Sequence, residues 1–512
     1  MARRLRSALM VGAAVAGALA ASPLQADTLR EALAQAYRSN PTLLGARAQQ
    51  RAVDENVPIE RAAGLPSADA TGRYTEFLAN SGGNNIGAAS RQLDSGISLG
   101  VPLYNGGAVR NSVRAAEQRI EAGRADLRGT ESALFTQVVA AYMDVLRDEA
   151  VVGLARNQVE VLDVNLQATR DQFEIGTLTR TDVAQSEARL ALARGDLRSA
   201  EANLIGSREN YIALVGDAPD DLAPPPPLGG LPTSLDGVVA TALDNNPDLL
   251  AARERAEAAG LDIRVAGAGR LPQVSVVTGY TYQNFLGSRS GGTGLALPQS
   301  SSGLQAGLNL SLPLFQGGRP AALQRQAQAR ASAALEQVVE VERGVISQAR
   351  SAWASYQASQ AIIASSETAV AAAALGLEGV RAENTVGNRT VLDILDAERE
   401  LLNTRVQLVT AQRNAYVAGF SLLAAMGRAE ARDLGLAEDG PLYDPAVNAD
   451  RVRGKWFDWS RDPNPETQAT RTLDVPAPDA TARPIGPLDE RAPSPVSPAP
   501  AQPIGTAPET GL

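Results

Sequence analysis

The sequence contains no cysteine and no histidine, and only 4% of its residues are aromatic. Without these side chains, thiol catalysis, Cys/His zinc sites, Ser-His-Asp triads and histidine general bases are excluded. A glycine-rich phosphate loop of the Walker type is also missing from the sequence. The composition therefore does not favour an enzyme, and it points to no cofactor and no metal.

Basic charge is also scarce, since 47 Lys and Arg stand against 57 Asp and Glu and give a net charge of -10. This balance disfavours nucleic acid as a partner. The 512 residues would suffice for about three ordinary domains, but long charged, Ala-rich stretches run without Gly or Pro. Such stretches are typical of long packed helices.

The N-terminus has the pattern of an export signal. Arginines among the first six residues precede an apolar run from Ala8 to Ala21, which is shorter than the roughly 20 residues of a membrane-spanning helix. We predict a signal peptide over residues 1–26, cleaved after Ala26. The absence of Cys excludes a lipid-modified N-terminal cysteine. We expect no later stretch to be long and apolar enough for a transmembrane helix, so membrane contact would use strands.

The chain after this signal is duplicated. The Asn-Pro pair at residues 40–41 recurs 206 residues later, and Gly176 recurs 211 residues later as Gly387. The spacing grows by five between Tyr280 and Pro313, which indicates a loop insertion in the second repeat. We predict repeat one over 27–216, a Pro-rich connector over 217–233, repeat two over 234–427, an equatorial segment over 428–462 and a disordered Pro/Ala-rich tail over 463–512.

Each repeat contains two segments with a period of two. From Leu304 to Leu314, leucine and alanine alternate with small or polar residues such as Gln305 and Asn309. Segments of about ten residues with one apolar face are typical of transmembrane barrel strands. A soluble sandwich would show the same alternation, but the two hairpins have no other sheet to pack against. We place exposed loops between the paired strands, at residues 79–92 and 285–303.

Helical patterns surround the strands. Each Asn-Pro pair is a helix start, and these first helices run to about Gly64 and Gly269. After the strands come helices over 107–173 and 318–384, roughly 100 Å long, then a turn and a shorter helix with two heptad rows. In each repeat, the helix before the strands and the helix after the turn, placed end to end, have nearly the length of the long helix. Each turn therefore closes an antiparallel hairpin at the end farthest from the strands.

Four strands per chain are too few for a closed barrel, because single-chain barrels have at least eight. Open sheet edges in lipid would leave backbone groups without hydrogen bonds. The strands must therefore be shared between subunits, as eight in a dimer or twelve in a trimer. Eight strands leave an interior filled by side chains, whereas twelve leave a lumen.

The chain resembles the TolC family of outer-membrane channel-tunnels in four features. These are the duplicated helix start, the Leu-Pro before each strand, the Gly-Gly at each strand exit and the segment VGNRTVLDILDAE at 386–398. The resemblance covers about residues 27–427. It implies a mixed α and β membrane protein, a homotrimer with a twelve-stranded barrel in the outer membrane and an α-helical tunnel in the periplasm. Residues 442–459 are similar to the end region of members that serve type I protein secretion.

The same resemblance implies an exit duct for proteins or small toxic compounds. Its partners would be outer-membrane lipid, a periplasmic adaptor and an inner-membrane transporter of the ABC or RND type. The alternative is a periplasmic coiled-coil adaptor or a structural protein of an export complex. An adaptor normally has one hairpin flanked by lipoyl-like segments and lacks lipid-facing strands.

The resemblance also assigns roles to the two turns, which are marked by Gly176 and Gly387 and form the periplasmic tip in the family. There, polar links close the inner coiled coil. Arg389 matches the family's tip arginine, and Thr181 and Asp182 match its partners in the repeat-one turn. Taken alone, Thr181 and Asp182 are also ordinary helix caps, and Arg389 is also an ordinary solvated turn charge.

Two further acids, Asp393 and Asp396, lie three residues apart on one helical face and match the acidic rings that constrict the entrance. The aligned residues of repeat one are Asp182 and Gln185, so the rings come only from repeat two. A tyrosine that joins the network in well-known members corresponds to Asn384 here. We therefore expect a latch that is built differently.

Overall fold

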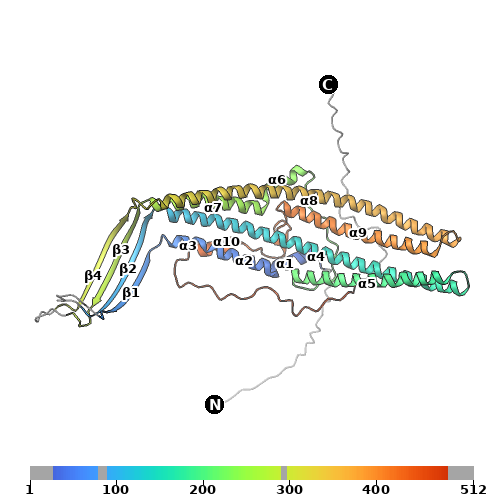
Figure 1. Cartoon of the computed structure of the whole chain (residues 1–512), viewed down its shortest axis with the longest axis horizontal. Coiled ribbons are helices and arrows are strands. Elements are labelled where there is room, and N and C mark those ends of the chain that lie inside the picture. The colour runs from blue at the N-terminus through green and yellow to red at the C-terminus, as the bar shows by residue number, and fades with distance from the viewer. Residues whose placement is uncertain (1–26, 79–88, 290–296, 482–512) are drawn as a thin grey trace, which may run out of the picture.

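The computed structural model describes residues 27–78, 89–289 and 297–481, so the predicted signal peptide, most of the first loop and the end of the tail lie outside it. The described chain is elongated (Figure 1). The strands form one end, the two hairpin turns form the other, and the shorter helices lie along the middle.

The two repeats have matching elements. Repeat one contains α1 (Leu29–Ser39), α2 (Pro41–Asp54), α3 (Asn56–Ala62), β1 (Ser67–Glu76), β2 (Arg91–Asn105), α4 (Ala108–Glu174) and α5 (Arg180–Val215). Repeat two contains α6 (Leu235–Asn245), α7 (Pro247–Gly267), the 3-10 helix η1 (Ala268–Arg270), β3 (Gln273–Asn284), β4 (Ser300–Ser311), α8 (Arg319–Thr385) and α9 (Val391–Ala425). The 3-10 helix η2 (Leu436–Asp439) and α10 (Pro445–Arg453) follow. The long helices α4 and α8 have the predicted 67 residues each, displaced by one position.

Three details differ from the sequence predictions. The first helix of repeat one is not continuous, because it breaks at Glu55 between α2 and α3. Pro58 explains the break, since its ring clashes with the carbonyl four residues earlier and it has no N–H to donate. The returning strand β4 begins at Ser300, inside the predicted loop, and ends at Ser311, before Leu314. The short helices α1 and α6 were not predicted, although Thr28 and Glu31 form a capping box at the start of α1.

The four strands form one antiparallel sheet in the order β1-β2-β3-β4. The pairing of β2 with β3 joins the two repeats. The registers place Leu308 opposite Val276, and Val276 opposite Val101, in one apolar cross-strand row. A polar row runs through Gln305, Gly279, Ser98 and Asp69. The alternation that predicted the strands thus gives the sheet one apolar and one polar face. Among the described residues, the outer strands β1 and β4 each have an edge without a partner strand.

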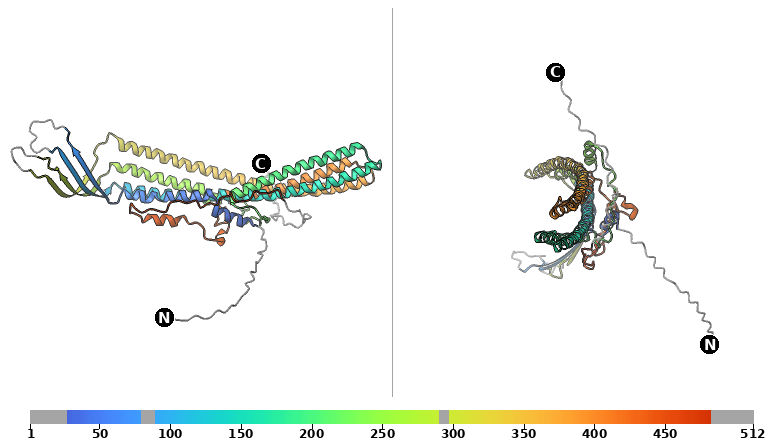
Figure 2. Two further views of the ribbon diagram at one scale, coloured as in Figure 1. Left: turned by 90° about the horizontal axis from the view of Figure 1, so that it is seen from below. Right: turned by 90° about the vertical axis from the view of Figure 1, so that its right-hand side faces the viewer.

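The helices follow an arc when the molecule is seen end-on (Figure 2). The N-terminal helices and α10 lie on the convex side of that arc, and no described segment crosses its concave side. The main core sits at mid-length, where Tyr142 and Phe135 of α4 and Phe420 of α9 are fully buried. The Tyr142 hydroxyl lies 2.8 Å from the carbonyl oxygen of Asp27 and 2.6 Å from that of Ala223, which ties the start of the chain and the connector to α4.

Among the described residues, one helix is long and apolar enough to cross a membrane by length and composition alone. It is α8, which contains an 18-residue window with a mean hydropathy of 1.3. Our expectation that no later helix would meet this criterion is therefore wrong. A single such helix is weak support for a membrane span, and α8 runs its whole length beside α7 and α9 (Figure 1).

Candidate gate at the hairpin tips

Both hairpin turns have the same backbone geometry. Gly176 and Gly387 have φ values of +81° and +83°, in the left-handed region where side chains with a Cβ are strained. In the first turn Thr177 donates its N–H to the carbonyl of Gln172 at 2.9 Å, and in the second Asn388 donates to Glu383 at 3.0 Å. This is a Schellman ending, which satisfies the last carbonyls of α4 and α8. The duplicated glycines therefore serve to reverse the chain at the tip.

The predicted acids Asp182 and Asp393 occupy equivalent positions after these turns. Each carboxylate accepts hydrogen bonds from the backbone N–H and the hydroxyl of a threonine three residues earlier, Thr179 or Thr390, at 2.7–2.8 Å. The threonine hydroxyl and its backbone N–H hold the pKa of each carboxyl below its usual range. Asp182 and Asp393 are thus the third helical residues of capping boxes whose N-caps are Thr179 and Thr390. Thr181 is the second residue of α5 and is not the cap.

Arg389 pairs within its own turn. Its Nε lies 2.7 Å from Glu383 Oε2, and a guanidinium nitrogen lies 4.0 Å from Asp393. These carboxylates, Glu383 first, raise the pKa of Arg389. Asn384 closes the same turn, because its side-chain amide donates to the Arg389 carbonyl oxygen at 2.8 Å. Within one chain, Arg389 makes no described hydrogen bond to Thr181 or Asp182.

Asp396 has a partner that the sequence did not suggest. Its carboxylate lies 2.5 Å from Arg189 of α5, so an ion pair joins the second hairpin to the first. The Arg189 side chain is 25% exposed and that of Asp396 is 56% exposed. The pair borders a groove of about 250 Å³ that is lined by residues of α4, α5 and α9. Asp396 is therefore part of a link between hairpins as well as a candidate for an acidic ring.

A second missed feature is a duplicated clasp across each hairpin. Arg170 of α4 pairs with Glu187 of α5 at 2.6 Å, and Arg381 of α8 pairs with Glu398 of α9. Both partners recur at the 211-residue spacing of the glycines, so the repeat itself contained the signal. The Glu398 side chain is only 6% exposed, whereas that of Glu187 is 50% exposed. The carboxylate of the second pair is therefore shielded from solvent, whereas that of the first is not.

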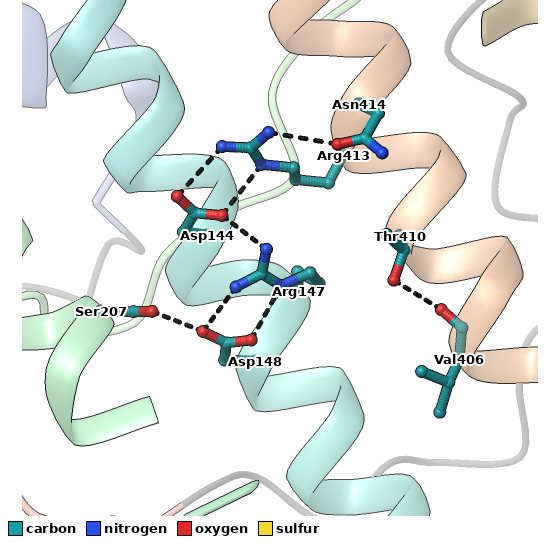
Figure 3. Close-up of polar contacts among 8 residues, drawn as sticks. All are labelled: Asp144, Arg147, Asp148, Ser207, Val406, Thr410, Arg413 and Asn414. Atoms are coloured by element: carbon teal, nitrogen blue, oxygen red, sulfur yellow. Dashed lines mark hydrogen bonds and ion pairs between the residues drawn. The ribbon is translucent and has the colours of Figure 1, made fainter. Parts of the chain in front are cut away.

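Farther from the tip, a cluster of charges ties the two repeats together (Figure 3). Arg413 of α9 donates two hydrogen bonds to Asp144 of α4, at 2.9 and 3.0 Å. Asp144 also pairs with Arg147, which in turn donates to Asp148, and Ser207 of α5 donates to the same Asp148. Asp144 lies 30 residues before the end of α4, about 45 Å from the tip. This cluster thus joins the two hairpins about 45 Å from the tip. Between the cluster and the tip, the Arg189–Asp396 ion pair links α5 with α9.

The polar links at the tip are exposed and individually weak. The described residues contain no group of three or more acids that would hold a metal ion. What gathers at the tip is a set of exposed charges on two rigid turns, with a further ion pair between the hairpins. Exposed pairs of this kind are individually weak, at about 0–1 kcal/mol each, so they can be broken and re-formed without unfolding the helices.

Comparison with known proteins finds relatives over most of the chain. Residues 32–217 and 238–428 match the family described as outer membrane efflux protein. The chain is 33% identical over 450 residues to the outer membrane efflux protein BepC of Brucella suis, which covers 88% of this chain and 94% of BepC. It is 28% identical to the outer membrane protein TolC of Vibrio cholerae, over 81% of this chain and 93% of that protein. The crystal structure of the outer membrane protein VceC from Vibrio cholerae has a TM-score of 0.65 at 24% identity, covering 78% of this chain and 96% of that one.

Proposed function

Because this chain belongs to the outer membrane efflux protein family and is a duct of the outer membrane, we propose that it works as the homotrimeric exit of a tripartite export system. An inner-membrane transporter of the ABC or RND type and a periplasmic adaptor would deliver the cargo to the hairpin tips. The cargo would leave through the barrel as a protein or a small toxic compound. The observation that carries this proposal is the open four-stranded sheet.

The sheet supports a shared barrel because its outer strands have unpaired edges and its apolar face lies bare. Leu304, Leu308 and Leu310 of β4 are 77%, 67% and 64% exposed in the single chain. A sheet in lipid must close on itself, since lipid offers no hydrogen bonds to its edges. Three copies would close twelve strands around a lumen, whereas two would leave an interior filled by side chains.

The helices support the same assembly. The apolar window of α8 is only 11% buried in one chain, and Leu335, Ile362 and Leu375 of this helix are more than half exposed. Apolar surface of this extent is costly in water, so a neighbouring subunit is expected to cover it. The concave side of the arc in Figure 2 would then face a common tunnel.

The gate belongs to the same proposal. We infer that Arg389 of one subunit reaches Thr181 and Asp182 of the next, since within one chain it pairs with Glu383 instead. Asp393 and Asp396 would form two rings of negative charge at the entrance. The short-range links Arg189–Asp396 and Arg389–Glu383 would hold each subunit's own hairpins in place.

The assembly is tested by the mass of the purified protein in detergent, measured by light scattering. Three copies are expected, and a dimer or a monomer would overturn the barrel. The transport role is tested by deleting the gene and comparing the secreted proteome with sensitivity to toxic compounds. A strain that loses neither secretion nor resistance would contradict an export duct.

A further inference from the structure

The C-terminal segment contains an aromatic turn, residues 454–461, that the proposed duct does not use. Trp456, Phe457 and Trp459 are 78%, 62% and 76% exposed. The whole chain has only three tryptophans, so two of them lie exposed within four positions. The rings of Trp456 and Phe457 pack edge to face, with centroids 6.5 Å apart. An exposed apolar patch of this kind usually marks a site that binds another molecule or a membrane.

The aromatic turn lies near the barrel end of the helices. Arg61, the residue before the last of α3, donates a hydrogen bond to the carbonyl oxygen of Arg453 at 3.0 Å, and β1 begins at Ser67. Figure 1 shows α10 beside α3, with the following chain turning back there along the helices. Of the C-terminal segment, the aromatic turn is therefore the part that comes closest to the sheet.

The distance of the aromatic turn from the strands can be estimated along α4. Arg453 lies 3.5 Å from Glu117, the tenth residue of α4, which places it about 14 Å from the end of the strands at 1.5 Å per residue. Three further residues to Trp456 span at most about 10 Å. The polar headgroup layer beneath the hydrocarbon is roughly 5–8 Å thick. The rings are therefore within reach of the headgroup layer on the periplasmic side.

The charges around the rings fit a lipid surface. Residues 451–462 contain four basic and two acidic side chains, a net charge of +2 in a chain of net charge -10. Arg451 and Lys455 both pair with Asp462 at 2.8 Å, which fixes the shape of the turn. Arg461 makes no hydrogen bond or ion pair with the described residues and is fully available. Tryptophan is enriched at membrane interfaces, and basic side chains near them attract anionic lipid headgroups.

We propose that the aromatic turn is a peripheral membrane anchor. It inserts Trp456, Phe457 and Trp459 into the periplasmic leaflet of the outer membrane beside the barrel, with Arg461 on anionic phospholipid headgroups. The chain then returns along the tunnel, where Arg208 and Arg156 donate to the carbonyl oxygens of residues 479–481. The C-terminal segment thus braces the helices against the membrane, whatever the duct exports.

The chain provides its own control for a test by fluorescence. Trp353 lies in α8, 34 residues from its start and so about 51 Å from the barrel. Three variants keep one tryptophan each: W353F/W459F keeps Trp456, W353F/W456F keeps Trp459, and W456F/W459F keeps Trp353. Each is placed in nanodiscs of phosphatidylcholine and phosphatidylglycerol, with plain or with brominated acyl chains.

Bromine quenches only the indoles that contact the acyl region. We expect emission from Trp456 and Trp459 to fall by about half in brominated discs, as for indoles at a membrane interface, while Trp353 is unchanged. Replacing phosphatidylglycerol by phosphatidylcholine should weaken the quenching, and so should R461Q. If Trp456 and Trp459 resist quenching as Trp353 does, the anchor is wrong, and shielded emission without quenching would mean that a second copy covers the rings. A channel that still conducts in those discs would leave the proposed duct intact.

Discussion

The side-chain amide of Asn246 donates a hydrogen bond to the carbonyl oxygen of Ala425 at 3.2 Å, while its side-chain oxygen accepts from the N–H groups of Asp248 and Leu249. One side chain therefore caps the start of α7 and the end of α9. Asn40 repeats the arrangement between α2 and α5. These joints place two shorter helices end to end, so that together they match the long helix beside them.

The double cap predicts an unusual result for a conservative substitution. Asn246→Asp keeps an equally good N-cap for α7 but removes the donor and brings a negative charge to the end of α9. We expect it to cost about 1–3 kcal/mol, at least as much as Asn246→Ala, because a buried carbonyl loses its partner. The measurement is the free energy of unfolding from denaturant titration of the assembled protein. Asn403→Asp on the exposed face of α9 is the control, expected within about 0.5 kcal/mol of wild type. Wild-type stability of Asn246→Asp would show that the hydrogen bond to Ala425 does not stabilise the protein.

A second prediction concerns the charge cluster of Figure 3. The side chains of Arg413 and Asp144 are 21% and 22% exposed, and they share two hydrogen bonds. Asp144→Asn and Arg413→Gln, alone and together, form a double-mutant cycle. We expect a coupling of about 1–3 kcal/mol, above that of surface pairs. A coupling near zero would mean that this charge cluster does not stabilise the packing of the two repeats.

A third prediction compares two adjacent residues of β4 whose side chains lie on opposite faces of the sheet. Leu308→Arg places a charge on the apolar row, with Val276 and Val101, and should cost about 2–4 kcal/mol near the membrane midplane. Asn309→Arg points to the polar face and should be tolerated. Assembly is measured as the yield of heat-resistant trimer in outer membranes. Equal defects in the two variants would mean that the apolar face does not meet lipid.

The elements with a strong period were predictable because their side chains must alternate between two environments. Leu304 to Leu310 and the heptads of α9 are examples, and every residue of those heptad rows is at least partly buried. The break at Glu55 was not predicted, and it follows from Pro58, which has no N–H to donate and whose ring clashes with a carbonyl one turn earlier. The link from Arg189 to Asp396 could not be predicted from the sequence, since the two residues are 207 positions apart and meet only through the packing of one hairpin against the other. The clasp of Arg381 was visible in the duplication.

The capping threonine predicts how selectivity depends on pH. Because Thr390 lowers the pKa of Asp393, this carboxylate stays charged to a lower pH than an ordinary aspartate, whose pKa is about 3.9. Its charge is present above the lowered pKa and is lost as the pH falls through it. Thr390→Val removes one hydrogen bond to the charged form, so the midpoint for loss of cation preference should move upward. Reversal potentials in planar bilayers measure it, with Thr179→Val as the matched change in repeat one. Equal shifts in both would place the ring in both repeats.

The last prediction separates the links at the gate. Arg389→Ser removes the proposed link to the next subunit and the pair with Glu383, whereas Glu383→Gln removes only the latter. Arg189→Ser breaks the pair with Asp396 that ties one subunit's hairpins together. Because the helices and the barrel are untouched, each variant should form a normal trimer.

Single-channel conductance then reports which links keep the tip closed. Three copies of a pair worth about 0–1 kcal/mol act together in a trimer, so losing all of them should visibly favour the open state. We expect raised conductance for Arg389→Ser, a smaller rise for Arg189→Ser, the largest for both together, and wild-type conductance for Glu383→Gln. If Glu383→Gln opens the channel as far as Arg389→Ser does, the pair inside the turn is the latch. If neither arginine variant changes conductance, Arg389 is a solvated turn residue, and the apolar contacts of the hairpins alone hold the tip closed.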